Sequence, residues 1–435
     1  MTAYWLERAW TGDGPVRTGV RVTVEDGVFT EVVDAEPVGA ERLAGLTVPG
    51  LANCHSHAFH RALRGRTQRE RGTFWTWREQ MYAVAARLTP DSYFELARAT
   101  YREMVAGGIT SVGEFHYLHH GLDGTPYDDP NAMGHALVAA ASEAGIRIAL
   151  LDTCYLAAGI GRAPEGVQVR FSDGSADAWA ERVTSAGPVG CDHVRGAALH
   201  SVRAVPRDQM PVVTAWSEAS TAPLHVHLSE QVAENDACVE AYGATPAAVL
   251  AEAGALGPRT SAVHATHLTD EDVRLLGLSS TRACFCPTTE RDLGDGIGPS
   301  RRLLDSGSPL TLGSDSHAVV DLFEEMRAVE LDERLATERR GHWDAEELLV
   351  AATRDGHGSL GFRDVGRIAV GDRADLVTLD TASPRTAGTG ADTGTAVFAA
   401  TAADVVRVVR DGVDVTVDPR EVGAELDRVI GRILA

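Results

Sequence analysis

The stretch VPGLANCHSHAFHRALRG, residues 48–65, decides the fold, because an apolar run ends there on two histidines, His55 and His57. Side chains two residues apart on a strand share one face, so both imidazoles can reach a single ion. The stretch by itself does not identify a metal site, since an isolated HxH pair is more often a surface or packed pair.

Two further apolar runs end on possible metal ligands. PLHVHLSE carries His225 and His227, and LTLGSDSH carries Asp315. Three runs that lie far apart in the sequence therefore each place a ligand type at the end of a strand. Together they predict one metal site built from strand ends.

Short β-branched or apolar runs alternate along the chain with longer segments of helical periodicity. Predicted helices cover residues 91–105, 131–144, 206–219, 245–255 and 321–335, and several open on Asp, Asn, Thr or Pro. Eight strand-then-helix units predict an α/β fold, a (β/α)8 TIM-type barrel whose active site lies at the carboxyl ends of its strands. The predicted strands are residues 46–48, 109–115, 147–155, 194–200, 223–228, 260–266, 282–287 and 310–316.

Both ends of the chain carry short alternating strands outside the predicted barrel. Residues 4–33 turn at Glu25-Asp26-Gly27, and residues 366–380 and 398–417 show the same pattern. Neither end is long enough to bury a core alone, so we predict that they pair into a small β-sandwich domain. The predicted domains are 1–48 (N-terminal part of the small β domain), 49–365 (barrel) and 366–435 (C-terminal part, with a final helix over 420–434).

Composition limits the functional classes. The chain has 435 residues, 44% of them hydrophobic, and no apolar run near the length of a membrane span. A formal net charge of -22 argues against nucleic-acid or anionic-membrane partners and means that an anionic substrate needs local cations. Residues 1–10 lack a signal-peptide pattern and the six cysteines include no CxxC pair, so we expect a cytoplasmic protein. All 40 basic residues are arginine, which leaves no lysine to bridge two metals and favours a mononuclear site.

Imidazole and carboxylate ligands suit zinc, and a position left for water would make such a site catalytic, because the pKa of bound water falls from 15.7 to about 7. Of the two histidines in PLHVHLSE, His227 is the better candidate, since Glu230 follows as it would on the loop above a barrel. His225 is predicted to be a core histidine. Glu230 is placed to carry protons, and His264 could polarise a substrate, although core or supporting roles are the default for His264 and His267.

Several motifs resemble the amidohydrolase superfamily in its deaminase branch: the HxH pair, a histidine before a glutamate, HATH and GSDSH. GRIAVGDRADLVTLD is similar to the segment that closes the small β domain of that superfamily. More narrowly, most of the chain resembles the formimidoylglutamate deiminases. The motifs are NCHSHAFHRALRG, TFWTWREQMY, GEFHYLHH, LHSVRAV, HLSEQVAENDAC, HATH, TERDLGDGIGP and LGSDSH, of which FWTWRE, EFHY and LGDGI are the most specific.

The resemblance implies one zinc ion per chain. Its ligands would be His55, His57, His227 and Asp315. Asp315 would also take the proton of the attacking water, Glu230 would shuttle protons, and His264 would stabilise the addition step. The implied reaction converts N-formimidoyl-L-glutamate and water to N-formyl-L-glutamate and ammonia in histidine degradation.

The implied substrate is a small anion with two carboxylates and a cationic amidine. Arg78, Tyr117 and Arg203 would hold the carboxylates, which bidentate arginines commonly bind. His200 would either lie near the substrate or support the barrel as a buried residue. His60 stands where many members of the family have glutamine, so we expect this position to affect substrate binding and the pH profile.

Two alternatives are open. The same fold could serve a deaminase of a purine, pyrimidine or triazine ring, whose pocket needs apolar walls and amide hydrogen bonds rather than two arginines. A noncatalytic barrel homologue with an assembly role would not need the complete ligand set with Glu230. We further expect a homodimer, and packing rather than ligand-binding roles for Trp75 and Trp77.

Overall fold

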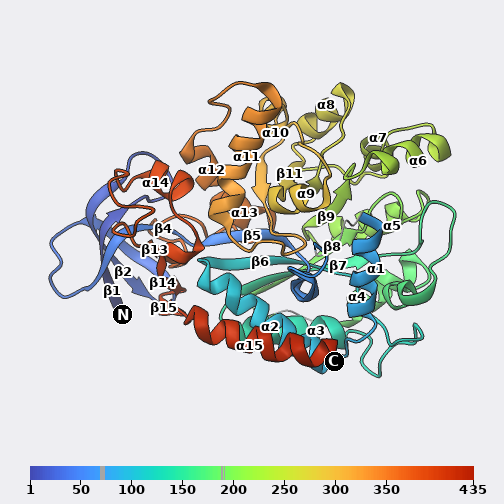
Figure 1. The fold of residues 1–435 in the computed structure, drawn as a ribbon, viewed down its shortest axis with the longest axis horizontal. Helices are drawn as coiled ribbons and strands as arrows, with labels where there is room; N and C mark the ends of the chain where they lie inside the picture. Colours follow the sequence, from blue (N-terminus) through green and yellow to red (C-terminus); the bar gives the residue numbers. More distant parts are fainter. Residues whose placement is uncertain (69–73, 188–189, 191) are drawn as a thin grey trace.

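The computed structural model describes residues 1–68, 74–187, 190 and 192–435, and within them two sheets account for the strands. The larger is an eight-stranded parallel sheet in the order β12-β11-β10-β9-β8-β7-β6-β5. Its end strands meet, because the backbone N–H groups of Ser314 and Asp315 both donate to the carbonyl of His55, at 3.1 and 3.0 Å. The sheet thus closes into the predicted barrel (Figure 1). Its strands are β5 (Leu51–Ser56), β6 (Ile109–His116), β7 (Arg147–Cys154), β8 (His193–Leu199), β9 (Leu224–Leu228), β10 (Thr260–His264), β11 (Arg282–Phe285) and β12 (Leu310–Leu312).

Helices follow the barrel strands and form the outer layer of the molecule (Figure 1). The five predicted helices correspond to α2, α3, α5, α7 and α11. α2 shows why such segments start where they do: Thr89 and Ser92 form a capping box, and Pro90 fills the first helical position. The helices are α1 (Phe74–Ala85), α2 (Pro90–Ala106), α3 (Ala132–Ala144), α4 (Ala176–Ser185), α5 (Met210–Ala219), α6 (Val232–Tyr242), α7 (Pro246–Glu252), α8 (Asp270–Leu278), α9 (Pro287–Leu293), α10 (Ser300–Ser306), α11 (Leu322–Thr337), α12 (Ala345–Ala352), α13 (Arg354–Ser359), α14 (Thr393–Phe398) and α15 (Pro419–Leu434), with 3-10 turns η1 (Ala58–Leu63), η2 (Gly166–Phe171) and η3 (Ala402–Asp404).

The prediction that residues 46–48 form the first barrel strand is wrong. They belong to β4 (Glu41–Pro49), which pairs with β1 and β13 in the smaller sheet. The apolar run continues across Pro49 and Gly50 into β5, so its hydrophobicity does not show where one sheet ends and the next begins. Gly50 permits the transition, since a Cβ there would lie 2.3 Å from the Thr110 hydroxyl oxygen.

The smaller sheet draws its strands from both ends of the chain, as predicted, in the order β15-β14-β13-β4-β1-β2-β3. The predicted turn joins β2 to β3 through Asp26 and Gly27, both at positive φ (50° and 81°). The sheet curls over its own apolar core. The curl brings the edge strand β3 to the segment before β13, where the Phe29 N–H donates to the carbonyl of Asp372 at 2.9 Å. Its strands are β1 (Thr2–Ala9), β2 (Arg17–Glu25), β3 (Val28–Asp34), β4, β13 (Leu376–Leu379), β14 (Val405–Arg410) and β15 (Val413–Asp414). The domain limits at 48/49 and 365/366 stay a prediction.

A buried ion-pair network joins the small sheet to the barrel. Arg147, at the start of β7, is fully buried and donates to both carboxylate oxygens of Asp375, at 2.5 and 2.9 Å. It also pairs with Asp411, which follows β14. The C-terminal helix α15 packs along α2, where Arg98 and Arg102 form ion pairs with Glu425 (Figure 1).

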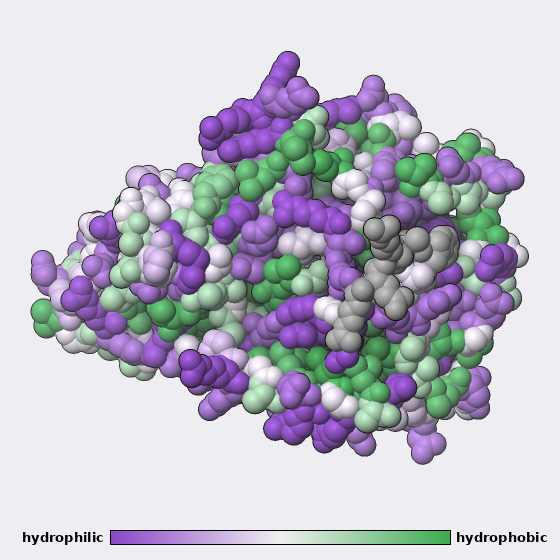
Figure 2. All heavy atoms as spheres, in the orientation of Figure 1, coloured by the Kyte–Doolittle hydropathy of each residue, from purple (hydrophilic) through white to green (hydrophobic). Residues whose placement is uncertain are grey.

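The surface is mixed in character. Hydrophobic and hydrophilic side chains are interspersed over the face shown in Figure 2. Among the described residues, no helix combines the length and the apolar composition required to cross a membrane.

Candidate active site

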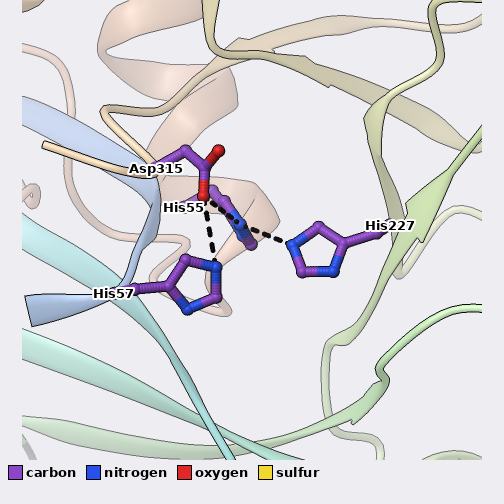
Figure 3. Close-up of side chains that lie close together, drawn as sticks. All are labelled: His55, His57, His227 and Asp315. Carbon is purple, nitrogen blue, oxygen red and sulfur yellow. Dashed lines mark hydrogen bonds and ion pairs between the residues drawn. The ribbon is translucent and has the colours of Figure 1, made fainter. Parts of the chain in front are cut away.

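Four buried side chains converge where the first and last barrel strands meet. His55 lies on β5 and His57 directly follows it, His227 lies on β9, and Asp315 follows β12 (Figure 3). Asp315 Oδ1 is 3.3 Å from His55 Nε2 and 3.2 Å from His57 Nε2. His227 Nε2 lies 3.0 Å from His55 Nε2, and the ligand atoms of the four residues all lie within 4.8 Å of one another. The structure thus brings together the four predicted ligands.

Backbone contacts set the direction of these imidazoles. His57 Nδ1 lies 2.9 Å from the carbonyl oxygen of Phe115, and His227 Nδ1 lies 2.9 Å from that of His200. A carbonyl only accepts, so each Nδ1 carries the proton and each Nε2 presents a lone pair to the cluster. Lone pairs and a carboxylate oxygen that face one another at about 3 Å repel unless a cation lies among them. The donor set therefore fits a divalent metal ion.

His55 is neutral, as a metal ligand must be, because burial lowers its pKa to about 4. Gly313 lets the last strand approach this histidine, since a Cβ on Gly313 would lie 2.7 Å from the His55 Cβ.

His225, two residues before His227, is fully buried and lies outside the ligand group. This position agrees with the predicted core role, and burial lowers its pKa to about 3.

His264 connects the predicted acid–base residues. Its Nε2 lies 3.7 Å from Asp315 Oδ2 and 3.9 Å from Glu230 Oε1, while its Nδ1 lies 3.2 Å from Glu290. Burial alone would lower the pKa of His264, but the hydrogen bond with Glu290 and the charges of Glu230 and Asp315 raise it well above its usual value. Burial also raises the pKa of the Glu230 carboxyl. His264 therefore lies among three carboxyl groups, whose charges favour its protonated form.

The backbone at these strand ends is unusual. His264 and Asp315 both have positive φ, at 69° and 38°, which only a few per cent of non-glycine residues adopt. Such conformations are often found at functional sites. His267, in the same HATH motif, points elsewhere, since its Nε2 binds the carbonyl oxygen of Asp295 at 2.7 Å.

A cavity opens onto the cluster and is also lined by the predicted substrate-binding residues. Those residues are His60, Arg78, Tyr117, His200 and Arg203. The ring Nε2 of His60 and the Tyr117 hydroxyl lie 3.0 Å apart. Arg203 donates from Nε to Glu234 at 2.6 Å, and its NH2 lies 3.7 Å from Glu230.

The cavity also holds residues that sequence reasoning did not assign. Trp77 lines it, whereas a packing role was predicted, and the side chain of Trp75 lies outside the described residues. Tyr155 is a second aromatic wall, and Gln168 donates to its hydroxyl at 2.9 Å. The further cavity-lining residues are Met81, Tyr82, Phe171 and Leu293.

Two supporting carboxyl groups were also missed. Glu290 binds His264, and Asp295, in the LGDGI motif, accepts a hydrogen bond from Gln231. Burial, together with the charge of Glu230, raises the pKa of Asp295 to about 8. Both residues lie in TERDLGDGIGP, one of the motifs that carry the resemblance, but the motif did not predict that Glu290 contacts His264.

A second histidine group is a poor metal site. His116, His119 and Asp152 also have ligand atoms within 4.8 Å of one another. However, both oxygens of Asp152 bind Arg182, at 2.8 and 2.9 Å, and Trp179 donates to the same carboxylate at 3.0 Å. The guanidinium neutralises the carboxylate and repels a second cation.

A family model, a curated relative and solved structures all match most of this chain. Residues 46–415 match the model of the Amidohydrolase family. The chain is 40% identical over 408 residues to "Formimidoylglutamate deiminase" of Pseudomonas aeruginosa, which covers 90% of this chain and 89% of the relative. A crystal structure of an amidohydrolase from Brucella melitensis covers 100% of both chains with a TM-score of 0.91 and 30% identity. A zinc-bound structure of an adenosine deaminase from Xanthomonas campestris covers 100% of this chain and 98% of its own, with a TM-score of 0.85 and 22% identity, which shows a shared fold.

Proposed function

The chain belongs to the amidohydrolase family, and from this premise we propose that it is a zinc-dependent formimidoylglutamate deiminase. It converts N-formimidoyl-L-glutamate and water to N-formyl-L-glutamate and ammonia, a step of histidine degradation. The 40% identical relative with that name supports the choice of substrate. A homodimer stays a prediction, which light scattering would test.

One observation carries the proposal: a single cavity is lined by two arginines and by three residues of the ligand group, His57, His227 and Asp315. The chain has a net charge of -22, so cations facing a cavity are a specific feature. Arg78 and Arg203 would bind the two carboxylates of the substrate through planar guanidinium groups. A purine or triazine ring has no carboxylate for these arginines to bind, which counts against a ring deaminase.

The residues that would hold one zinc ion are His55, His57, His227 and Asp315. A zinc ion at this position would act as a Lewis acid and make water nucleophilic at neutral pH. The chain contains no lysine to bridge a second ion, which supports a single metal.

The proton steps follow from the carboxyl groups around His264. Asp315 would take the proton of the attacking water, and a protonated His264 would stabilise negative charge that develops during addition. Glu230, whose pKa is raised by burial, would then give a proton to the terminal nitrogen of the tetrahedral carbon. The arginines hold the substituted nitrogen away with the glutamyl part, so ammonia departs.

Product analysis tests the proposal. The purified enzyme, incubated with N-formimidoyl-L-glutamate, should release equal amounts of ammonia and N-formyl-L-glutamate. Glutamate with formamide would show the opposite orientation and refute the role of Glu230. Activity on adenosine, guanine or a triazine but not on formimidoylglutamate would support a ring deaminase, and inactivity of zinc-loaded protein on all of them would support a noncatalytic homologue.

A further inference from the structure

A second cavity lies beside the active-site cavity and shares Arg78 and Arg203 with it. Arg162 lines this outer cavity but not the inner one. We infer that Arg162 is an outer anion-binding residue, which binds a carboxylate of the substrate before that substrate reaches Arg203. The inference rests on the proposed function for the chemistry of the substrate, a small dicarboxylate.

Backbone hydrogen bonds hold the loop that lines the outer cavity against the residue next to Arg203. Directly after β7, the N–H groups of Leu156 and Ala157 both donate to the carbonyl of Ala204, at 2.7 and 2.9 Å. Ala204 is the neighbour of Arg203. The loop after β7 and the loop after β8 are therefore joined at the residue next to the predicted carboxylate-binding arginine.

The same loop then forms a tight turn that presents Arg162. Ala158 N–H donates to the carbonyl of Arg162, and Arg162 N–H donates to the carbonyl of Gly159, both at 2.9 Å. Gly159 and Arg162 form an isolated antiparallel bridge. Because this turn is short and closed by backbone hydrogen bonds, the backbone of Arg162 has a defined position at the outer cavity.

The charges around Arg162 leave it able to bind a ligand. Glu165 lies 3.5 Å from its NH2, but the two side chains are 66% and 78% exposed. Exposed ion pairs of this kind contribute little, so a substrate carboxylate can compete with Glu165. Of the acidic groups that line the outer cavity, Glu234 is already bound to Arg203 and Glu240 is exposed.

The position of Arg162 determines which kinetic step it affects. It lies outside the cavity that contains the ligand group, so it cannot contribute to the chemical step. A cation near the entrance of an acidic protein raises the rate at which an anion is captured, and salt screens this effect. Arg162 should therefore act on kcat/KM at low ionic strength and leave kcat unchanged.

The test compares two matched variants of the zinc-loaded enzyme. Arg162→Gln removes the outer cation, and Arg274→Gln is the control, because Arg274 is a similarly exposed arginine paired with Glu271 three residues away. Arg162→Gln should lower kcat/KM by about threefold to tenfold in low salt, and the loss should vanish near 0.5 M salt, where the screening length is only about 4 Å. Arg162→Lys should keep most of the wild-type value, and Arg274→Gln should have no effect.

Equal effects of Arg162→Gln and Arg274→Gln, or a loss that persists unchanged in high salt, would overturn the inference. Calorimetric binding of N-formyl-L-glutamate separates this outcome from failure of the proposed function. If wild type does not turn over formimidoylglutamate, the proposed function fails. The outer site then stands only if Arg162→Gln weakens binding of this dicarboxylate in low salt more than Arg274→Gln does.

Discussion

Replacing Arg203 by glutamine tests the proposed substrate most directly. Its Nε donates to Glu234 at 2.6 Å, whereas its NH2 lies 3.7 Å from Glu230, beyond hydrogen-bond distance, so the terminal nitrogens can donate to a substrate carboxylate. Truncation of one partner of a buried charge pair costs about 2 to 5 kcal/mol. Because the Arg203 side chain is 23% exposed, we expect the lower part of this range. A loss of about 2 to 3 kcal/mol corresponds to a decrease of roughly 30- to 150-fold in kcat/KM.

The assay is steady-state ammonia release from N-formimidoyl-L-glutamate, combined with zinc analysis. Zinc content should stay at the wild-type level, because Arg203 is not among the ligand residues. Arg207→Gln is the control: Arg207 lies in the same segment, but it is 44% exposed and pairs with Glu252 at the surface. This control should change kcat/KM by less than twofold.

A second variant separates substrate binding from structural damage. Arg203→Gln leaves the fully buried side chain of Glu234 without its cation, which could itself disturb the site. The double variant Arg203→Gln/Glu234→Gln removes that unpaired charge and keeps an acceptor for the Ser229 N–H, which donates to Glu234. If the double variant regains wild-type kcat/KM, Arg203 only neutralises Glu234, and its assignment as the carboxylate-binding residue is refuted.

Four other predictions address the metal, the acid and the fold. Wild type should contain one zinc per chain by elemental analysis, and His57→Ala should lose both zinc and activity; two tightly bound ions would contradict the mononuclear site. Glu230→Gln should slow turnover by roughly 10²- to 10⁴-fold while zinc remains bound, and a change below tenfold would exclude it as the acid. Arg147→Met should cost about 3 to 5 kcal/mol in urea unfolding, because Asp375 is left buried without its cation, and a loss under 1 kcal/mol would show that the network is dispensable. Burial lowers the pKa of His357 to about 4, so the unfolded chain takes up a proton that the folded chain does not between about pH 6.5 and 4. Stability should therefore fall with decreasing pH across this window, by about 2 kcal/mol at pH 5 from this residue, and His357→Gln should reduce the slope of the unfolding free energy against pH.

The sequence allowed much of the barrel to be predicted because its strands are short apolar runs with polar ends. Seven predicted strands overlap β6 to β12, and the ligand types at the ends of β5, β9 and β12 converge because parallel strands end at the same side of a barrel. The error at residues 46–48 has the same origin. Hydrophobicity identifies a buried strand, but it carries no information about which sheet that strand joins.

The supporting residues of the site were not predictable in this way. Glu234, on α6, and Glu290, on α9, contact Arg203 and His264, which lie on other segments of the chain that the sequence does not relate to these helices. Tyr155 and Gln168 meet only because η2 folds back over the end of β7. Such contacts depend on loop geometry, and a pattern of residue types does not determine that geometry.

The meeting of β5 and β12 places the ligand group where the chain closes on itself. His55 and Asp315 are separated by most of the barrel in sequence, yet the Asp315 backbone binds the His55 carbonyl directly. During synthesis, three of the four proposed ligands therefore leave the ribosome before the strand that precedes the fourth has been made. A fragment that ends before Leu310 would carry His55, His57 and His227 without the carboxylate or the strand beside it. If this chain binds zinc as proposed, the strand that closes the barrel also completes the metal site, so we expect metal binding and barrel closure to be coupled during folding.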